Sequence, residues 1–591
     1  MRILRIAMAQ MNPTVGDIAG NTRAIKRWIK EARKAKADVV AFPELAVTGY
    51  PPEDLLLKPR FVADNLRALD EIAKDCKGVL AVVGHVGLGR AANGKSRQSV
   101  VAAGQHELTN AAALIGERGV LCRYSKWLLP NYGVFDESRY FHPGRTLPVI
   151  TFRGATVGLN ICEDIWFPDG PTRLQAAAGA DVIININASP FQIGKSRIRE
   201  QMLATRAREN GVIVTYTNTV GGQDELVFDG NSVVFDASGV VVARGASMEE
   251  DLLIADLLVE ELLQRQLHES RLRRLRGFSQ PSTPVRRVDV TVTPKRDRPL
   301  LRITVPPPAP MVAETYRALV VGTRDYVQKI GFEHAFVALS GGIDSAIVGA
   351  IAVDALGAER VTGVSMPSRY SSEGSISDAV DLAQRLGIRL ISLPIEAVHQ
   401  AALDTLEREF GADDLGVAGE NVQSRARGML VMALSNHRPR SLVLTTGNKS
   451  EYACGYATLY GDMVGGFAVI KDVPKTLVWE LARYRNTLGA VIPENSITKP
   501  PSAELRPNQL DSDSLPAYEV LDPIIEAYVE DDLSLEAIVA RGNDEATVKR
   551  VIDMVNRNEY KRRQAPPGVK ITSRAFGRDR RLPLASRYRG Y

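Results

Sequence analysis

Three residues in the first third of the chain carry side chains that could together cleave an amide bond. Glu44 ends one predicted strand, Lys126 lies in the segment Y-S-K-W-L-L-P-N-Y-G-V-F-D-E, and Cys162 follows another strand in G-L-N-I-C-E-D-I-W. A thiol can attack an amide carbon, a carboxylate can take and return its proton, and an ammonium can stabilise the developing oxyanion. Each residue alone is also typical of an ordinary surface or core position. Their combination at strand ends favours an active site.

A glycine-rich segment in the second half of the chain could bind a phosphate chain. Residues 336–348, F-V-A-L-S-G-G-I-D-S-A-I-V, change from strand character to an apolar helix. The bare N–H groups of the glycines, the hydroxyls of Ser340 and Ser345 and the helix N-terminus suit phosphate, and Asp344 could hold a magnesium ion. No lysine follows the glycines, which argues against a Walker-type loop and γ-phosphate transfer. The alternative is an ordinary βα turn of a doubly wound sheet.

A second glycine-containing segment also has the letters of a phosphate loop. Residues 89–96 read G-R-A-A-N-G-K-S, but residues 99–104 after them alternate as a strand does. A phosphate loop of this kind must open a helix. We therefore predict a hairpin loop here.

The first 260 residues have the pattern of an α/β sandwich, because many strands alternate with few helices. Predicted strands cover residues 3–9, 38–42, 79–87, 99–104, 110–116, 156–161, 182–187 and 212–217, with a helix at 20–35. After residue 310 the pattern favours a doubly wound parallel sheet, whose ligands should lie at the strand C-termini near residues 366–372 and 445–451. Predicted strands there cover 361–366, 389–393 and 441–445, and predicted helices 313–330, 376–386, 421–435 and 476–484.

Between these two patterns the composition becomes basic and rich in proline, as in a connector. Residues 271–276 read R-L-R-R-L-R, and three prolines stand at 306–308. No aromatic residues alternate with these arginines for base stacking, and a formal net charge of +5 is small for 591 residues, so we expect no nucleic-acid partner. The predicted domains are residues 1–260 and 311–591, joined by a connector at 261–310.

Length and composition predict a large globular protein. A chain of 591 residues with 45% hydrophobic and 24% charged residues has room for at least two cores. Its longest apolar runs are far too short to span a bilayer, and its N-terminus lacks a signal-peptide pattern, so we expect no membrane partner and a cytoplasmic location. The four cysteines are widely scattered and predict neither a disulfide framework nor a zinc site.

The phosphate-binding segment resembles a known family. Residues 340–345, S-G-G-I-D-S, are similar to the S-G-G-x-D-S loop of the PP-loop ATP pyrophosphatases. This resemblance implies that the loop grips the pyrophosphate of ATP while AMP is transferred to a carboxylate or carbonyl of a substrate.

The segments around Glu44, Lys126 and Cys162 resemble the nitrilase, or carbon–nitrogen hydrolase, superfamily in chain order and local context. The resemblance implies that Cys162 attacks a carboxamide, that Glu44 is general base and then general acid, and that Lys126 stabilises the tetrahedral intermediate. Glu137 would be a second carboxylate near the nucleophile. Because a nearby cation lowers the pKa of a thiol, Lys126 should favour a deprotonated Cys162.

Four further segments resemble the NAD synthetase branch of the PP-loop family. They are E-N-V-Q-S-R-A-R (420–427), T-T-G-N-K-S-E (445–451), Y-G-D (460–462) and E-Y-K-R-R-Q (559–564). With the nitrilase-type half in front, nearly the whole chain resembles the family of glutamine-dependent NAD synthetases. An α-β-β-α sandwich followed by a Rossmann-like sheet is the fold that this implies.

The resemblance implies substrates and the residues that bind them. The substrates would be glutamine, ATP and deamido-NAD, with Mg²⁺ held by Asp344 and Glu451. Glutamine would be bound by Tyr132, Ser189 and Lys195, although Arg197 and Arg199 stand close to Lys195. ATP would be bound by Leu339, Ser340, Gly341, Gly342, Ile343, Asp344, Ser345, Ala346 and Thr446, and deamido-NAD by Asn421, Glu451 and Lys561. Otherwise Asn421 could cap a helix, Glu451 could form a surface ion pair and Lys561 could be a solvated cation.

Ammonia chemistry adds a physical expectation. At neutral pH free ammonia is mostly ammonium, which has no lone pair for attack, so we expect an apolar protected path between the two sites and a signal that couples them. We also expect a homo-oligomer. Two alternatives stay open: an amidase fused to a PP-loop ligase that amidates a different carboxylate, and a non-enzymatic protein that keeps relics of both sites.

Overall fold

A computed structural model of the chain describes residues 2–89, 107–262, 285–291, 298–411 and 415–588. Its contacts divide the chain into two compact units: Met1–Gln223 with Phe228–Ala309, and Asp224–Val227 with Pro310–Tyr591. Most of the predicted hairpin loop at 89–96, the predicted strand at 99–104 and the basic run at 271–276 lie outside the described residues.

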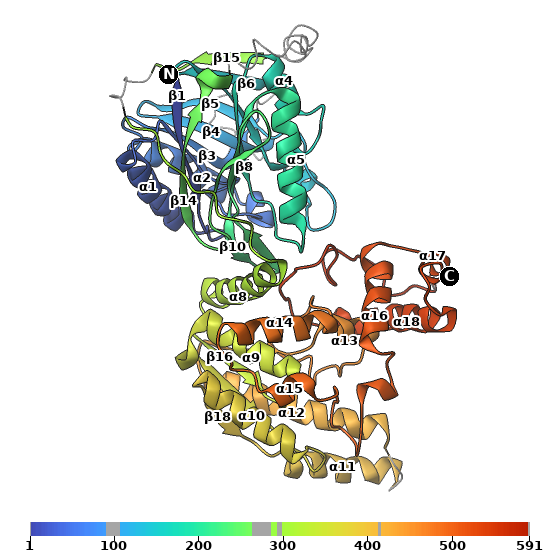
Figure 1. Cartoon of the computed structure of the whole chain (residues 1–591). Helices are drawn as coiled ribbons and strands as arrows, with labels where there is room; N and C mark the ends of the chain where they lie inside the picture. Colours follow the sequence, from blue (N-terminus) through green and yellow to red (C-terminus); the bar gives the residue numbers. More distant parts are fainter. Residues whose placement is uncertain (1, 90–106, 263–284, 292–297, 412–414, 589–591) are drawn as a thin grey trace. The chain divides into compact units, whose positions relative to one another are not determined.

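Two sheets form the centre of the first unit (Figure 1). In its described part, six strands pair in the order β14-β1-β2-β3-β4-β5 and seven in the order β13-β12-β9-β8-β7-β6-β15. The first sheet contains β1 (Ile3–Gln10), β2 (Val39–Ala41), β3 (Leu80–Leu88), β4 (Leu108–Gly116), β5 (Gly119–Ser125) and β14 (Asp251–Leu258). The second contains β6 (Leu147–Phe152), β7 (Ala155–Ile161), β8 (Val182–Asn187), β9 (Ile213–Asn218), β12 (Val233–Phe235), β13 (Val241–Arg244) and β15 (Val285–Asp289).

The apolar sequence of β1 explains how the layers form. Successive side chains of a strand point to opposite faces, and both faces of β1 are apolar. Leu4, Ile6 and Met8 pack in the core between the two sheets. Ala7 and Ala9 pack on the other side, against the helices. A strand that is apolar on both faces must be covered on both, which predicts a layered fold.

Helices cover the outer faces of both sheets. Helices α1 (Ile18–Lys34) and α2 (Pro59–Ala73) pack on the first sheet, and α4 (Pro171–Ala177) and α5 (Lys195–Asn210) on the second. The fold of this unit is therefore an α-β-β-α sandwich, as the sequence predicts. A small hairpin of β10 (Val220–Gln223) and β11 (Leu226–Asp229) follows β9.

Part of the predicted connector is built into the first unit. β15 pairs in parallel with β6 from Val285 to Asp289 at the edge of the second sheet. Arg298 donates a hydrogen bond of 3.1 Å to Asp38, which precedes β2. Two segments of the connector therefore form a β-strand pair and a charged hydrogen bond with the first unit. Their proline-rich, basic composition does not predict these contacts.

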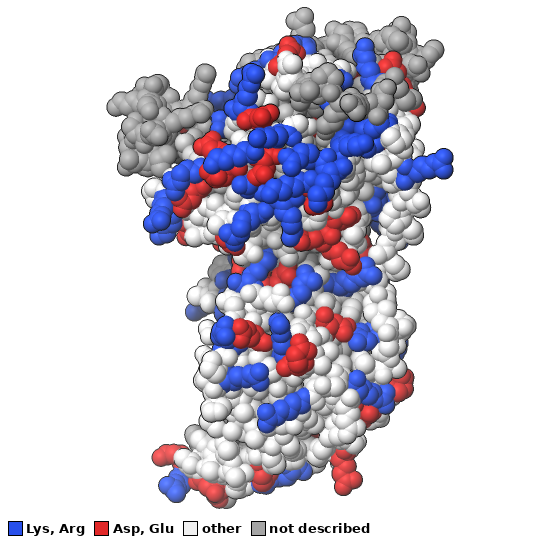
Figure 2. Space-filling view, turned by 90° about the vertical axis from the view of Figure 1, so that its left-hand side faces the viewer, with Lys and Arg blue, Asp and Glu red and all other residues white. Residues whose placement is uncertain are grey.

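One face of the first unit carries many charged side chains of both signs. Figure 2 shows lysines and arginines interleaved with carboxylates on the face that carries α1 and α2. Ion pairs on these helices or directly after α2 join Lys26 to Asp75, Lys34 to Glu31 and Lys74 to Glu71. Exposed pairs of this kind contribute little to stability, and the face is a solvated surface with mixed charge.

The second unit contains a parallel sheet. Among the described residues, its strands pair in the order β18-β17-β16-β19-β20, every pair parallel. They are β16 (His334–Ala338), β17 (Val361–Ser365), β18 (Arg389–Ser392), β19 (Ser441–Thr445) and β20 (Phe467–Ala468). Helices α8 (Met311–Ile330), α9 (Ile343–Leu356) and α14 (Lys475–Thr487) pack together along one layer.

A separate layer contains α11 (Glu396–Phe410) and α12 (Val417–His437), where Val431 packs with Phe336 and Val443 of the sheet. Together these layers confirm the doubly wound architecture. The remaining helices are α10 (Glu373–Leu386), α13 (Lys449–Cys454), α15 (Glu494–Thr498), α16 (Tyr518–Ile525), α17 (Leu535–Val539), α18 (Glu545–Arg557) and α19 (Glu559–Arg562). Helices α13, α16 and α18 share a core of their own (Figure 1). No helix in the described ranges is long and apolar enough to cross a membrane.

Two candidate active sites

The first candidate site lies where strands of both sheets end in the first unit. Glu44 follows β2, Lys126 follows β5, Cys162 follows β7, and Ser189 follows β8. Hydrogen bonds and short-range charge interactions connect the first three of these residues. The sandwich therefore brings together residues that stand up to 118 positions apart in the chain, counted from Glu44 to Cys162.

Lys126 is the centre of this site. Its ammonium donates hydrogen bonds of 2.7 Å to Glu44 Oε1 and 2.8 Å to Glu137 Oε1, and its side chain has 0% exposure. Burial alone would lower the pKa of Lys126, but the charges of Glu137 and Glu44 raise it well above its ordinary value. Lys126 is thus a permanently charged donor in a dry environment, where such a charge acts most strongly.

Donors also orient the carboxylate of Glu44. Its Oε1 accepts a hydrogen bond of 2.6 Å from Asn110 Nδ2, in addition to that from Lys126. Its Oε2 accepts one of 3.0 Å from the N–H of Ala188. These contacts hold Glu44 in one orientation with its charge compensated. Asn110 lies in a strand of small apolar residues and was not predicted as a site residue. A single amide side chain in such a strand is a sequence feature that could have indicated a role in the site.

Glu137, the second predicted carboxylate, lies beside the first. It accepts hydrogen bonds from Lys126, from the hydroxyl of Tyr50 at 2.9 Å and from Asn110 at 3.3 Å. Burial raises the pKa of Glu137 to about 7, against the lowering effect of Lys126. The site therefore carries two carboxylates near one ammonium, and Glu137 can take up or release a proton near neutral pH.

This pKa predicts an unusual effect of pH on stability in the variant Glu137→Gln. A carboxyl group with a raised pKa in the folded state destabilises that state as pH rises through the folded pKa, whereas glutamine stays neutral. We expect the melting temperature of the wild type, relative to that of the variant, to fall between pH 5 and pH 8. Thermal unfolding across this range measures the difference, with Glu117→Gln at an exposed position as the control. A difference that stays constant or rises with pH would contradict the assignment.

Cys162 lies in the first turn after β7 with an unusual backbone. Its φ is 45°, which lies in the left-handed region of backbone conformations. This conformation is unfavourable for any residue that has a β-carbon. Where a non-glycine residue adopts it, the residue is often part of a functional site. The side chain is buried. Burial raises the pKa of the Cys162 thiol well above its ordinary value, and Glu44 raises it further, whereas Lys126 lowers it.

The expectation of a deprotonated Cys162 was therefore wrong. It considered the nearby cation alone, but two carboxylates already neutralise Lys126, and burial disfavours an additional negative charge. The resting nucleophile is a thiol. Its proton must leave as the sulfur attacks, which requires a base beside it such as Glu44.

The three residues predicted to bind glutamine differ in exposure and in their hydrogen-bond partners. The side chain of Tyr132 is 58% exposed, and its hydroxyl donates hydrogen bonds of 2.8 and 3.0 Å to the carboxylate of Glu163. Ser189 is buried, with its N–H bonded to Asn218 Oδ1 at 2.9 Å. Lys195 begins α5 and donates to the carbonyl of Pro190 at 3.1 Å.

Glu163 and Arg199 show what sequence reasoning missed. Glu163 follows the nucleophile directly, which is a signal that could have marked it, and only 8% of it is exposed. Arg199, an alternative to Lys195, is buried and donates to both oxygens of Asp229. Its charge is thus committed to a buried ion pair.

The second candidate site is a cavity of about 300 Å³ in the second unit. It is lined by the phosphate-loop segment after β16 and by segments after β17 and β19, as the strand C-termini of a doubly wound sheet predict. Predicted ATP-binding residues that line it are Leu339, Ser340, Gly342, Ile343, Asp344, Ser345 and Thr446. Gly341 and Ala346 do not line it.

The loop is held in shape by its own serines. Ser345 Oγ donates to the carbonyl of Gly342 at 2.9 Å and accepts from the N–H of Ser340 at 3.2 Å. Gly341 has φ +79°, and a β-carbon there would lie 2.2 Å from the carbonyl oxygen of Ser375. A glycine is therefore required at this turn, which leads directly into the N-terminus of α9.

Asp344 and Glu451, the predicted metal ligands, both line the cavity. Asn448 connects them, because its Nδ2 donates to Asp344 Oδ1 at 3.0 Å while its Oδ1 accepts from the N–H of Glu451 at 3.0 Å. Burial raises the pKa of Glu451 well above its ordinary value, and the charge of Asp344 raises it further. Two half-buried carboxylates beside a phosphate loop fit a magnesium ion, which prefers oxygen ligands and few protein ligands. Among the described residues no group of three or more His, Cys, Asp or Glu side chains is arranged to hold a metal.

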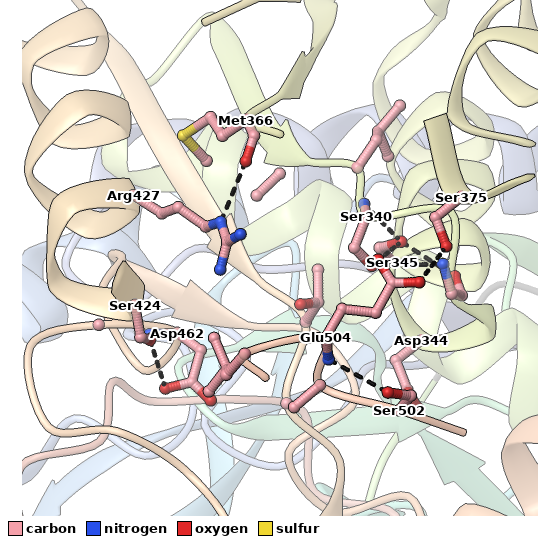
Figure 3. A pocket seen from close by; sticks show the side chains of 18 of the residues that line it. Ser340, Asp344, Ser345, Met366, Ser375, Ser424, Arg427, Asp462, Ser502 and Glu504 are labelled. Carbon is pink, nitrogen blue, oxygen red and sulfur yellow. Dashed lines mark hydrogen bonds between the residues drawn. The ribbon is translucent and has the colours of Figure 1, made fainter. Parts of the chain in front are cut away.

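Several residues of the cavity were not predicted individually. Lys475 at the start of α14 pairs with Asp344 and is buried. Figure 3 shows Arg427 and Asp462 on one side of the cavity and Ser340 and Asp344 on the other. Arg427 donates through Nε to the carbonyl of Met366 at 3.1 Å, and burial lowers its pKa. The cavity therefore presents two cations, Arg427 and Lys475, as a ligand with several phosphates would require.

Of the three residues predicted to bind deamido-NAD, only Glu451 lines the cavity. Asn421 and Lys561 both contact the segment at 455–458 instead. Asn421 Oδ1 accepts a hydrogen bond of 2.9 Å from the hydroxyl of Thr458, which does line the cavity. Lys561 donates to the carbonyls of Gly455 at 2.7 Å and Ala457 at 2.9 Å. These two residues hold one wall of the cavity in place.

Comparison with known families assigns both units. Residues 5–264 match the carbon-nitrogen hydrolase family, and residues 315–565 match the NAD synthase family. The first site, with its thiol, ammonium and carboxylates, lies within the first match, and the phosphate-loop cavity lies within the second. The two matches together define a two-domain protein that joins a carbon–nitrogen hydrolase to an NAD synthase.

Comparison of the whole chain is more specific. The glutamine-dependent NAD(+) synthetase of Aquifex aeolicus (strain VF5) is 45% identical over 99% of this chain and 100% of the relative. That of Thermotoga maritima (strain ATCC 43589 / DSM 3109 / JCM 10099 / NBRC 100826 / MSB8) is 44% identical over the full length of both chains. The solved glutamine-dependent NAD+ synthetase of Acinetobacter baumannii in complex with ADP is 40% identical over 98% of both chains, with a TM-score of 0.72. The chain belongs to the glutamine-dependent NAD(+) synthetases.

Proposed function

We propose that the chain makes NAD from deamido-NAD in two half-reactions, one in each unit. The observation that carries this proposal is the buried ammonium of Lys126, which lies between two carboxylates beside the thiol of Cys162. A thiol, a base and an oxyanion partner within one buried cluster can hydrolyse an amide. The phosphate-loop cavity supports the second half-reaction.

In the first unit, the sulfur of Cys162 forms a bond to the side-chain amide carbon of glutamine while the thiol proton passes to Glu44. The ammonium of Lys126 stabilises the oxyanion. As the intermediate collapses, the C–N bond breaks and Glu44 gives the proton to the departing ammonia, which leaves a thioester. Water then attacks the thioester with Glu44 as base, the C–S bond breaks, and the proton returns to sulfur as glutamate is released.

Binding of glutamine requires groups of opposite charge for its α-ammonium and α-carboxylate. Glu163, oriented by the hydroxyl of Tyr132, is a carboxylate next to the nucleophile and suits the ammonium. Lys195 suits the carboxylate, because its ammonium carries the opposite charge and can donate to it. Ser189, at the end of β8, completes the set that we assign to glutamine.

In the second unit, we assign the loop at 339–346 and Thr446 to ATP, and Glu451, Asn421 and Lys561 to deamido-NAD. The nicotinate carboxylate of deamido-NAD attacks the α-phosphate of ATP, pyrophosphate leaves, and ammonia then displaces AMP from the carbonyl carbon. Asp344 and Glu451 would hold Mg²⁺, which neutralises phosphate charge when bound. Lys475 supplies the cation that the loop itself lacks, because it reaches the cavity from α14.

Ammonia must pass from the first half-reaction to the second without becoming ammonium. We therefore keep a protected, apolar path as part of the proposal, together with coupling that restrains glutamine hydrolysis until the adenylate forms. A homo-oligomer, and the domain limits 1–260 and 311–591, stay predictions. The four cysteines are buried and free, which suits the reducing cytoplasm that we propose as the location.

Release of pyrophosphate tests the proposed substrate. With ATP, Mg²⁺ and glutamine present, we expect pyrophosphate to appear only when deamido-NAD is added, because this carboxylate is what ATP activates. Glutamate release, followed in the same samples, should increase with it. Pyrophosphate release with another carboxylic acid would favour the alternative, a ligase for a different substrate. No pyrophosphate under any condition would contradict both.

A further inference from the structure

We propose that Asp164 is a positioning residue that fixes the nucleophile and the oxyanion partner of the first site relative to each other. This inference rests on the proposed glutaminase reaction and deepens it. Asp164 has 0% exposure and stands two residues after Cys162. Its Oδ1 accepts hydrogen bonds of 3.0 Å from the N–H of Trp127 and 2.9 Å from the N–H of Leu128, the two residues after Lys126.

The other oxygen of the same carboxylate binds the segments that lead to the two catalytic side chains. Asp164 Oδ2 accepts a hydrogen bond of 3.1 Å from the N–H of Ile161, which directly precedes Cys162. It also accepts one of 2.7 Å from the hydroxyl of Tyr124, two residues before Lys126. One buried carboxylate thus joins the backbone after Lys126 and the side chain of Tyr124 before it to the backbone that leads to Cys162.

The arrangement also explains why Asp164 does not act on substrate. A carboxylate has about four positions at which it can accept a hydrogen bond, and in Asp164 four donors occupy them. Burial raises the pKa of Asp164 to about 6, although its hydrogen bonds lower it, so the group is mostly ionised at neutral pH. An ionised carboxylate with all its acceptor positions used can fix geometry but has no free position for a ligand.

The strained backbone of Cys162 needs such support. A non-glycine residue keeps a left-handed φ only where the surrounding structure holds it there. The hydrogen bond from the N–H of Ile161 to Asp164 fixes the peptide between Asn160 and Ile161, one residue before the strained position. If the turn relaxes, the sulfur moves relative to the ammonium of Lys126, and a displacement of about 1 Å can reduce a rate by about 10²-fold.

Replacement of Asp164 by asparagine tests the proposal, because it keeps the shape of the side chain while it changes the hydrogen bonding and removes the buried negative charge. In either orientation the new NH₂ group would face a backbone N–H that needs an acceptor: that of Ile161, or those of Trp127 and Leu128. Two donors cannot satisfy each other, so at least one segment must move.

The experiment uses the full chain with three variants. Asp164→Asn removes the proposed clamp, and Tyr124→Phe removes one of its four donors. Asp236→Asn is the matched control, because Asp236 also accepts two backbone N–H groups, those of Ser238 and Val240, but in a turn between β12 and β13. Five quantities are measured for each: kcat and KM for glutamine hydrolysis, the rate of alkylation at the Cys162 peptide by iodoacetamide, the rate of NAD synthesis from ammonium salt, and the melting temperature.

For Asp164→Asn we expect kcat of glutamine hydrolysis to fall by about 10²-fold, with KM changed by less than about fivefold. Alkylation of Cys162 should slow by about tenfold, while NAD synthesis from ammonium salt stays within about twofold. Tyr124→Phe should show a several-fold loss of kcat, and Asp236→Asn no loss. An Asp164→Asn enzyme with the kcat and alkylation rate of the wild type would overturn the proposal.

Two other results are also decisive. If Asp164→Asn loses synthesis from both nitrogen donors because it does not fold, Tyr124→Phe decides the matter: a lowered kcat with ammonium-driven synthesis intact supports the clamp, and an unchanged kcat overturns it. If the wild type does not hydrolyse glutamine at all, the proposed function itself fails, which these measurements distinguish from failure of the clamp.

Discussion

The variant Cys162→Ala is expected to lose glutamine-driven NAD synthesis by about 10⁴-fold or more, the scale on which a catalytic nucleophile is lost. Synthesis from ammonium salt at raised pH should stay within about twofold of the wild type. The reason is that the second half-reaction needs only free ammonia, which is more abundant at high pH. Initial rates of NAD formation with each nitrogen donor measure both effects.

Cys122→Ala is the matched control, because Cys122 is buried in the same core between the sheets as Cys162. It should keep both activities. If Cys162→Ala lost both activities while Cys122→Ala kept both, the two half-reactions would not be separable as proposed. Glutamine-driven synthesis that survives in Cys162→Ala would rule out this thiol as the nucleophile.

The second large effect is expected for Asp344→Asn, which should lose NAD synthesis from both nitrogen donors by roughly 10³-fold. Stabilisation of phosphate charge by a metal ion amounts to several kcal/mol, and about 1.4 kcal/mol corresponds to a factor of ten in rate. The substitution also leaves the buried ammonium of Lys475 without its ion-pair partner. Pyrophosphate release and NAD formation, each at several Mg²⁺ concentrations, measure the loss.

Asp354→Asn provides the comparison on the same helix. Asp354 lies in α9 and pairs with Arg485 at 2.7 Å, but it does not line the cavity. This variant should keep synthesis within a few-fold, and alkylation of Cys162 should be unchanged in both variants. An Asp344→Asn enzyme that synthesises NAD from ammonium at the wild-type rate would contradict the metal site.

The fold was largely predictable because local pattern and global architecture agree. The strand before Cys162 and β8 are buried on both faces and apolar on one, and β1 is largely apolar on both, which is what a sandwich with four layers requires. Residues at the ends of such strands lie together at one edge of the sheets, so Glu44, Lys126 and Cys162 could be grouped before any coordinates existed. The glycine-rich loop could be predicted equally well, because the strand before it and the helix after it are adjacent to it in the sequence.

The parts that sequence reasoning missed depend on contacts between distant segments. Lys475 reaches Asp344 from 131 positions away, and no local pattern connects them. The protonation state of Cys162 depends on burial and on the sum of four neighbouring charges, which cannot be obtained from one neighbouring cation. Asp164 looked like an ordinary residue of C-E-D-I-W until its four donors were placed around it. Edge strand β15 was hidden by a composition typical of a linker.

The central claim is that nitrogen released by the Cys162 thiol reaches the activated carboxylate without mixing with water. Glutamine labelled with nitrogen-15 in its side-chain amide, supplied with an excess of unlabelled ammonium, ATP, Mg²⁺ and deamido-NAD, tests it directly by the mass of the NAD formed. The account predicts that NAD made by the wild type carries far more label than the bulk ammonia, and that NAD made by Cys162→Ala carries none. Wild-type NAD with only the label content of the bulk ammonia would contradict it.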